Sequence, residues 1–488
     1  MRTLCTLIPL LAAAVPAAEI PKLWDDKELA EWANPVAGLN VRPGHFSESE
    51  YYAAPVENLR TYPVYAPDRE PAGYWDSLKK KKPEPLIELN KTRSAAEWIA
   101  EGRRVFEEMD VPGFRVWDPK VIAKARSREE LKKSGAVLLK DGTVYGFRWA
   151  VTPKGIALSV QECAGCHLRI MPDGSTLPGA PFNKNVGSLL QPLLDAAEAY
   201  FLSGDSPAMV QFRSFGVPWL KPDIHEQIKT MKKSQLGELL DSNPPGTFPR
   251  FNGSPYYTTK VPDLIGIASR KYIDHTATHR HRGIGDIMRY GAMVSSSDSG
   301  DFGPYRAFTE KQRRIFYRFP DEVFYSQAMY FYSLEPPPNP HRSDERAARG
   351  KDIFERESCG TCHPAPLYTN NKLTLATGFT PPKEHYKMLD ILPVSVGTDP
   401  GAALKTRKGT GYYKVPSLKG LWYRGLYLHD GSVASLEEMF DPERLSPKHV
   451  PGGFKGYKVT HRAVPGHEFG LKLQPDERAS LIAFLKTL

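Results

Sequence analysis

Two segments far apart in the chain share one pattern of apolar and polar positions. Residues 100–106 (Ala-Glu-Gly-Arg-Arg-Val-Phe) are repeated as residues 348–354 (Ala-Arg-Gly-Lys-Asp-Ile-Phe). Ser94 is followed three residues later by Glu97, the arrangement of a capping box, and residues 343–345 (Ser-Asp-Glu) favour a helix start before the second copy. We therefore expect a helix at each copy.

The repeat extends beyond these helices. Residues 260–266 (Lys-Val-Pro-Asp-Leu-Ile-Gly) match residues 414–420 (Lys-Val-Pro-Ser-Leu-Lys-Gly), and residues 272–275 (Tyr-Ile-Asp-His) resemble residues 427–430 (Tyr-Leu-His-Asp). Such self-similarity indicates two homologous halves. Further apolar-periodic stretches follow in each half, and they are residues 284–288, residues 436–440 and a closing helix that begins at Pro475.

The pattern predicts a mainly α-helical fold with long irregular loops. The proline-rich residues 336–340 read as an extended linker between the halves, because such a run suits neither a helix nor a central strand. Residues 107–162 are an insertion in the first half, with a small β-hairpin turning at Asp141-Gly142. Residues 19–92 show neither period and are expected to form an irregular N-terminal arm.

The first eighteen residues match a secretory signal. An apolar run after Met1 and Arg2 ends in small residues before Glu19, so cleavage is expected near Ala18, which would remove Cys5. The run is too short for a spanning helix, so the mature protein is not expected to span a membrane and should be periplasmic or secreted. The net charge of +9 is dispersed and no nucleic-acid-binding motif is present, so an acidic redox partner fits this charge better than nucleic acid.

The chemistry lies in two Cys-x-x-Cys-His motifs, Cys163-Ala-Gly-Cys166-His167 and Cys359-Gly-Thr-Cys362-His363. This spacing lets two cysteines bond the vinyl groups of one porphyrin while the adjacent imidazole reaches the iron. A zinc site would need further ligands at short spacing, and a redox dithiol does not need the histidine. The motifs predict two covalently bound haem c groups, so the halves become cytochrome c-like domains at 93–335 and 341–488.

Function depends on the sixth ligand of each iron, because an iron with two strong axial ligands transfers electrons and an open iron binds small oxidants. For the second haem His467, His429 and Met439 are candidates, with Met439 better explained as a core residue. For the first haem the candidates, besides an open site, are His275, His279, His281 and Met288.

These motifs resemble the di-haem cytochrome c peroxidase superfamily, which includes MauG-type enzymes and di-haem rubber oxygenases. The resemblance covers roughly residues 94–488 and rests on both haem motifs, residues 415–420, residues 427–432 and Leu436-Glu-Glu. Residues 282–290 and the Gly466-His-Glu-Phe-Gly ending look most like the rubber-oxygenase-like branch. That likeness implies His467 as the second ligand of the C-terminal haem and a reactive N-terminal haem.

The sequence also departs from that family. Ile273 stands where peroxidase members carry a tryptophan between the haems, and their acid–base glutamate has no clear match, Asp286 being the nearest acidic residue. Neither Trp219 nor Tyr423 is assigned a role between the haems. These departures argue against classical peroxidase activity. Members of the rubber-oxygenase branch are longer, and the apolar residues that line their substrate cavity have no match here, so their substrate does not transfer and catalytic residues are unassigned.

Two functions follow from these observations. The first is an exported di-haem oxidoreductase that uses oxygen or peroxide at the N-terminal haem, with the C-terminal haem relaying electrons. The alternative is a pure electron-transfer cytochrome in which both irons are six-coordinate. In either case the partner is a redox protein or a small oxidant.

Overall fold

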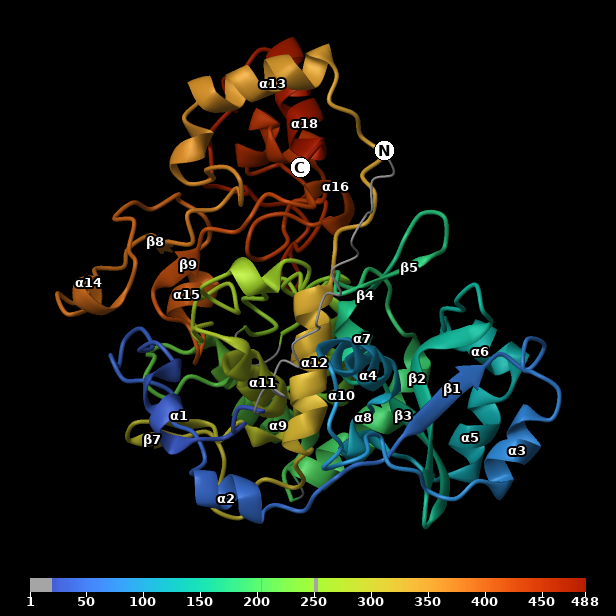
Figure 1. Ribbon diagram of the computed structural model, residues 1–488. Coiled ribbons are helices and arrows are strands. Elements are labelled where there is room, and N and C mark those ends of the chain that lie inside the picture. The colour runs from blue at the N-terminus through green and yellow to red at the C-terminus, as the bar shows by residue number, and fades with distance from the viewer. Residues whose placement is uncertain (1–19, 203, 250–252) are drawn as a thin grey trace, which may run out of the picture.

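The computed structural model describes residues 20–202, 204–249 and 253–488 (Figure 1). The predicted signal segment and Cys5 lie outside the described residues. As predicted, the fold is mainly helical, with small antiparallel sheets and much irregular chain. The helices are α1 (Asp26–Trp32), α2 (Glu48–Ala53), α3 (Tyr74–Lys80), α4 (Ala95–Glu108), α5 (Pro119–Ala125), α6 (Arg128–Ser134), α7 (Cys163–His167), α8 (Gln191–Phe201), α9 (Pro207–Phe215), α10 (Lys233–Asp241), α11 (Ile284–Ala292), α12 (Asp321–Ser333), α13 (Glu345–Arg356), α14 (His385–Met388), α15 (Gly401–Leu404), α16 (Leu421–Arg424), α17 (Leu436–Met439) and α18 (Pro475–Lys486). The strands are β1 (Thr61–Tyr65), β2 (Thr143–Thr152), β3 (Gly155–Val160), β4 (Leu168–Ile170), β5 (Thr176–Pro178), β6 (Asp301–Phe302), β7 (Tyr305–Arg306), β8 (Leu373–Leu375) and β9 (Tyr412–Lys414).

Each repeated helix packs against the closing helix of its half. A Cβ atom at Gly102 of α4 would lie 1.9 Å from the carbonyl oxygen of Ser326 in α12, and one at Gly350 of α13 would lie 1.9 Å from that of Ser480 in α18. Glycine therefore permits the same close helix crossing in both halves. Both predicted helices are confirmed, the first with its Ser94 capping box and the second capped by Asp344.

The predicted hairpin is part of a larger sheet. Leu138 bridges Val144 beside the Asp141-Gly142 turn, but β2 continues to Thr152 and pairs with β3 from Phe147 to Thr152. On its other side it pairs antiparallel with β1, in the register Thr61 opposite Ala150. A two-stranded hairpin is marginally stable alone, and the third strand and a separate hydrophobic cluster on this sheet supply the missing support.

The N-terminal arm is not irregular throughout, which corrects the prediction. It contains α1, α2, α3 and β1, and the first two helices begin at local caps formed by Asp25 and by Ser47 with Glu50. These helices are too short to show a clear period in the sequence. Two fully buried tryptophans fix the arm, since Trp24 Nε1 donates to the Phe46 carbonyl at 2.9 Å and Trp32 Nε1 to that of Arg280 at 3.1 Å.

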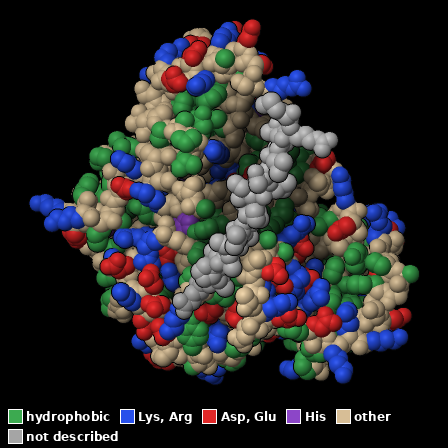
Figure 2. Space-filling model, in the orientation of Figure 1, with side chains coloured by type: hydrophobic (Ala, Val, Ile, Leu, Met, Phe, Trp, Pro, Cys, Tyr) green, Lys and Arg blue, Asp and Glu red, His purple; other side chains and the backbone are tan. Residues whose placement is uncertain are grey.

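The second half sits above the first in Figure 1, with α13 and α18 at the top and α12 running up through the first half. Between α12 and α13, residues 334–344 form neither helix nor strand. No helix within the described residues is long and apolar enough to cross a membrane. Figure 2 shows acidic and basic side chains interspersed over this face, without one basic patch.

Candidate functional site

The two Cys-x-x-Cys-His motifs begin on short helical turns. The first forms α7, and Tyr145 of β2 anchors it by donating its hydroxyl to the carbonyls of Gly165 and Leu168 at 3.2 and 3.1 Å. The second begins on a single 3₁₀ turn, Cys359–Thr361, just after α13. None of the four motif cysteines forms a disulfide within the described residues, and burial raises the pKa of Cys359 to about 11. A raised pKa argues against a redox dithiol there, because reactive thiols have lowered pKa values.

Each motif histidine meets the same element of the repeat. The backbone of Pro262 lies against the His167 imidazole, and that of Pro416 lies against His363. These prolines are the third residues of the repeated segments at 260–266 and 414–420. Burial lowers the pKa of both histidines, that of His167 to about 4, so both imidazoles are neutral at pH 7. A neutral imidazole is the form that binds a metal.

In the second half, the structure brings His467 to His363. Their ring centroids are 6.4 Å apart with an interplanar angle of 57°. Because a metal–imidazole bond is about 2 Å long and the ring centroid lies roughly 1 Å behind its nitrogen, imidazoles on opposite faces of one ion have centroids about 6 Å apart. Burial lowers the pKa of His467 to about 4, with His363 adding to the effect. This ring spacing would allow both imidazoles to bind one metal ion between them.

Backbone contacts hold His467 in place. Gly466 has φ +83°, and a Cβ there would lie 2.2 Å from the backbone nitrogen of Thr398, so glycine is required at this close approach. Arg444 is fully buried and donates to the carbonyls of Gly466 at 2.8 Å and His467 at 2.9 Å. Sequence reasoning missed Arg444, because no motif marks a side chain that acts through backbone carbonyls.

The other two candidates have contacts of their own. His429 stacks on Tyr413, with centroids 4.0 Å apart, and its carbonyl accepts a hydrogen bond from the Lys260 amide at 2.8 Å. Met439 is buried in the hydrophobic cluster around α13 and α18, where the sequence placed it as a core residue. His429 is not in ring contact with His363 among the described residues, and the cluster of Met439 also includes Cys359 of the second motif.

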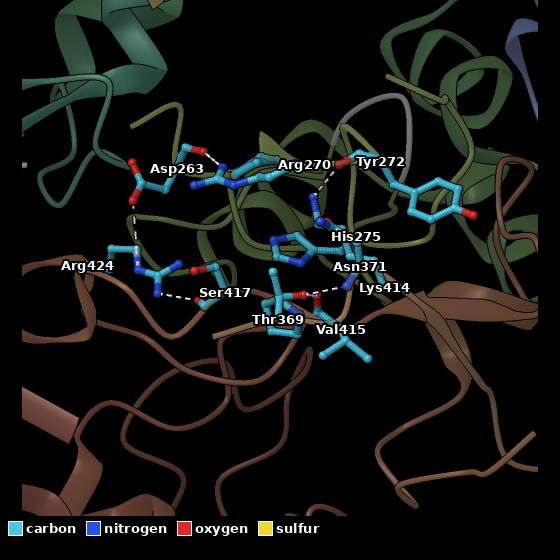
Figure 3. A pocket seen from close by; sticks show the side chains of 12 residues that line it. Asp263, Arg270, Tyr272, His275, Thr369, Asn371, Lys414, Val415, Ser417 and Arg424 are labelled. Carbon is cyan, nitrogen blue, oxygen red and sulfur yellow. Dashed lines mark hydrogen bonds and ion pairs between the residues drawn. The ribbon is translucent and has the colours of Figure 1, made fainter. Parts of the chain in front are cut away.

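The histidine candidates of the first half all have other surroundings. His281 uses both nitrogens, one on the Arg270 carbonyl and one on the Tyr332 hydroxyl, each at 2.6 Å. His279 bonds Asp274 at 3.1 Å and packs on Trp32 with ring centroids 4.5 Å apart. His275 lies between the halves, in the pocket of Figure 3. The structure therefore does not gather these three side chains at one point.

Apolar residues fill the part of the first half that corresponds to the His467 segment. His467 lies in the stretch that leads into α18, whereas the stretch leading into α12 contains no histidine between residues 283 and 320. Its Ile315, Tyr317 and Phe319 are buried in the same cluster as Ala164 of the first motif. Met288 of α11 belongs to this cluster too. The surroundings of the two motifs are therefore unequal.

Asp286 does not act as an unpaired acid. It accepts hydrogen bonds from Arg282 at 2.9 Å and Arg289 at 2.8 Å. Burial opposes its ionisation, but these two arginines outweigh burial and lower its pKa. Trp219 packs on Phe302 and Tyr305, while the Tyr423 hydroxyl bonds Asp263 at 3.0 Å.

Comparison with known proteins finds partial and weak similarities. No protein-family model matches the chain. The uncharacterized protein y4iJ of Sinorhizobium fredii (strain NBRC 101917 / NGR234) is 32% identical over an alignment that covers 16% of this chain and 18% of that protein, so the chain spans less than a fifth of its length. Hydrazine synthase of Kuenenia stuttgartiensis has 16% identity and a TM-score of 0.27, over 47% of this chain and 72% of that one. A MauG-like protein associated with microbial copper homeostasis has 18% identity and a TM-score of 0.23, over 34% of this chain and 56% of that one. With similarities this distant, function must be inferred from the chain's own residues.

Proposed function

We propose that this chain is an exported di-haem c-type cytochrome acting as an oxidoreductase. Cys163 and Cys166 would attach one haem with His167 as iron ligand, and Cys359 and Cys362 the other with His363. When bound, a haem supplies an iron that changes oxidation state and, where one axial face is open, binds oxygen or peroxide. The residues fit this group, since each motif pairs two thiols with a neutral, enclosed imidazole.

The unequal surroundings of the two motif histidines carry the proposal. His363 faces His467 at the spacing of two axial ligands, which suits electron relay. His167 belongs to a half whose corresponding segment contributes Ile315 and Tyr317 to an apolar core. Such a histidine-free segment offers this haem no counterpart of His467 as a second strong ligand. Accordingly, we assign oxidant chemistry to the N-terminal haem.

The first test is low-temperature EPR of the oxidised, haem-loaded protein with and without cyanide. We expect one low-spin signal that cyanide leaves unchanged and one high-spin signal that cyanide converts to low-spin. Haem content by pyridine haemochromogen should be two per chain, falling to one in C163A/C166A and in C359A/C362A. The high-spin signal should be absent from the C163A/C166A variant and present in C359A/C362A.

Buried Met288 favours one alternative, a pure electron carrier in which both irons are six-coordinate. Two low-spin signals indifferent to cyanide would establish the carrier and contradict the oxidoreductase. The variant M288L would then show whether Met288 is the ligand, because leucine keeps the volume and lacks the sulfur.

Export and the partner belong to the same proposal. The signal-like first eighteen residues support export to the periplasm or outside the cell, where electrons would pass to or from a redox partner protein or a small oxidant. The dispersed net charge of +9 suits an acidic partner.

A further inference from the structure

A pocket between the two halves carries an excess of positive charge. Arg270 contributes from the first half, and Lys414 and Arg424 from the second (Figure 3). Asp263 is the one carboxylate that lines this pocket within the described residues. Its Oδ2 lies 3.8 Å from Arg424 Nε and also accepts the Tyr423 hydroxyl. Three cations therefore face one acid.

These cations are held in place by backbone carbonyls. Lys414 Nζ donates to the carbonyls of Tyr272 at 3.0 Å and Ile273 at 2.8 Å, and Arg424 Nη2 donates to that of Ser417 at 2.6 Å. Arg270 donates to the carbonyls of Asp263 and Ile265. Carbonyl dipoles orient these groups without neutralising their charge, so an anion in the pocket would find positioned donors.

The repeat builds this region twice. The Lys414 amide donates to the His275 carbonyl at 3.1 Å, and the Lys260 amide donates to the His429 carbonyl at 2.8 Å. Lys260 Nζ in turn donates to the carbonyl of Leu426 in the second half, just as Lys414 Nζ donates to carbonyls of the first half. Burial is the largest cause that lowers the pKa of each lysine, to about 7, and neighbouring arginines add to it. A bound carboxylate would reverse that effect.

Both candidate haem sites adjoin the pocket. Pro262 and Pro416 line it, and the backbones of the same two residues lie against the His167 and His363 imidazoles. In addition, His275 Nε2 is enclosed and has no hydrogen-bond partner among the described residues. A carboxylate in the pocket would meet cations from both halves and one unused imidazole nitrogen.

We propose that this pocket is a carboxylate-binding site and that its occupants are propionates of the two haems. The inference rests on the proposed di-haem function and adds to it that haem charge, not protein contacts alone, holds the halves together. Each haem c carries two carboxylates in addition to its thioether links, which matches a site lined by three basic side chains. A free carboxylate or phosphate from solution has the same chemistry and is the competing source.

The test compares the midpoint potentials of both haems in the haem-loaded wild type, K414Q and R424Q. Removing a cation beside a haem disfavours its reduction, so at least one midpoint should shift downward in each variant. The matched control is K419Q, because Lys419 is exposed and lies in the same half, and its midpoints should equal those of the wild type. K414R keeps the charge and should restore most of the shift.

Haem content separates the two proposals. A wild type without haem would overturn the di-haem function itself. A wild type with two haems whose midpoints are the same in K414Q, R424Q and K419Q would overturn the carboxylate site alone. If a glutamine variant loses haem, K414M and R424M provide the test, since they remove the charge and keep a long unbranched side chain, and unchanged midpoints in both would equally overturn the site.

The source of the carboxylate is tested by titrating acetate and phosphate into the wild type. If propionates already occupy the pocket, acetate and phosphate should shift the midpoint potentials no more than chloride does at the same ionic strength. A saturable shift that K414Q abolishes would assign the pocket to a free anion and overturn the propionate occupants.

Discussion

His467 owes its position to bonds made by its backbone. Arg444 binds its carbonyl, and its amide donates to the Val396 carbonyl at 2.5 Å. The side chain is therefore free to act as a ligand while the loop stays fixed. This makes a truncation of the imidazole an informative change, since it removes the ligand and leaves the loop contacts in place.

We predict that H467A converts the second haem from low-spin to high-spin and makes it bind cyanide or carbon monoxide. The reason is that His363 would then be its sole strong axial ligand. EPR and absorbance spectra measure the change. The control is H461A, because His461 is exposed in the same segment, and its spectra should match the wild type. A low-spin second haem in H467A would show that another residue is the ligand.

At the scale of elements, two glycines decide how close the helices of each half come. The neighbours of Gly102 and Gly350 are equivalent, since the added Cβ would also lie 2.8 Å from the Cβ of Tyr330 in one half and of Phe484 in the other. Backbone cannot move aside as a flexible side chain can, so both helix pairs must separate to accept alanine.

We predict that G102A and G350A each destabilise the protein by about 2 kcal/mol or more, as overpacked positions do. Gly237 in α10 is the control, because nothing lies within 4 Å of its added Cβ. At this position alanine should be neutral or should stabilise the protein by about 0.5–1 kcal/mol, because it lowers the conformational entropy of the unfolded chain and favours the helix. Denaturant unfolding measures all three, and equal effects at Gly102 and Gly237 would contradict the close crossing.

At the scale of the whole molecule, the arm and the second half both meet the first half at charged or titratable groups. His45 of the arm lies 6.3 Å from His279 between ring centroids. Lys408 of the second half bonds Asp298 of the first at 2.7 Å. Burial opposes ionisation of Asp298, but Lys408 and Arg407 outweigh burial and hold its pKa well below the ordinary range.

We predict that stability falls as the pH drops from about 6.5 towards 3, with His45 contributing. Burial lowers the pKa of His45 to about 3, whereas the same imidazole has its ordinary pKa near 6.5 in the unfolded chain. Between these two pH values the unfolded chain binds a proton that the folded chain does not, so a falling pH favours unfolding. In H45Q the free energy of unfolding should fall less between pH 6.5 and 3, by at most about 4 kcal/mol. Urea unfolding at several pH values measures it, with exposed His461→Gln as the control. A slope unchanged in H45Q would contradict the assignment.

Several local features were predictable because they depend on neighbours in sequence. The Ser94 capping box, the helix starts at Asp344 and Pro475, and the strand turn at Asp141-Gly142 all follow from residues within one or two turns. The arm was misjudged because α1 and α2 are single short helices fixed by buried tryptophans, and contacts of that range leave no period in the sequence.

The sequence by itself determined the two helical halves and the two cysteine–histidine motifs, because repeats and fixed spacings are local patterns. The tertiary structure alone decided which of His467, His429 and Met439 stands opposite His363, and that cations from both halves meet in one pocket. The physical reason is the same in both cases. A ligand pair or a charge cluster depends on distances between segments that the chain brings together only by packing.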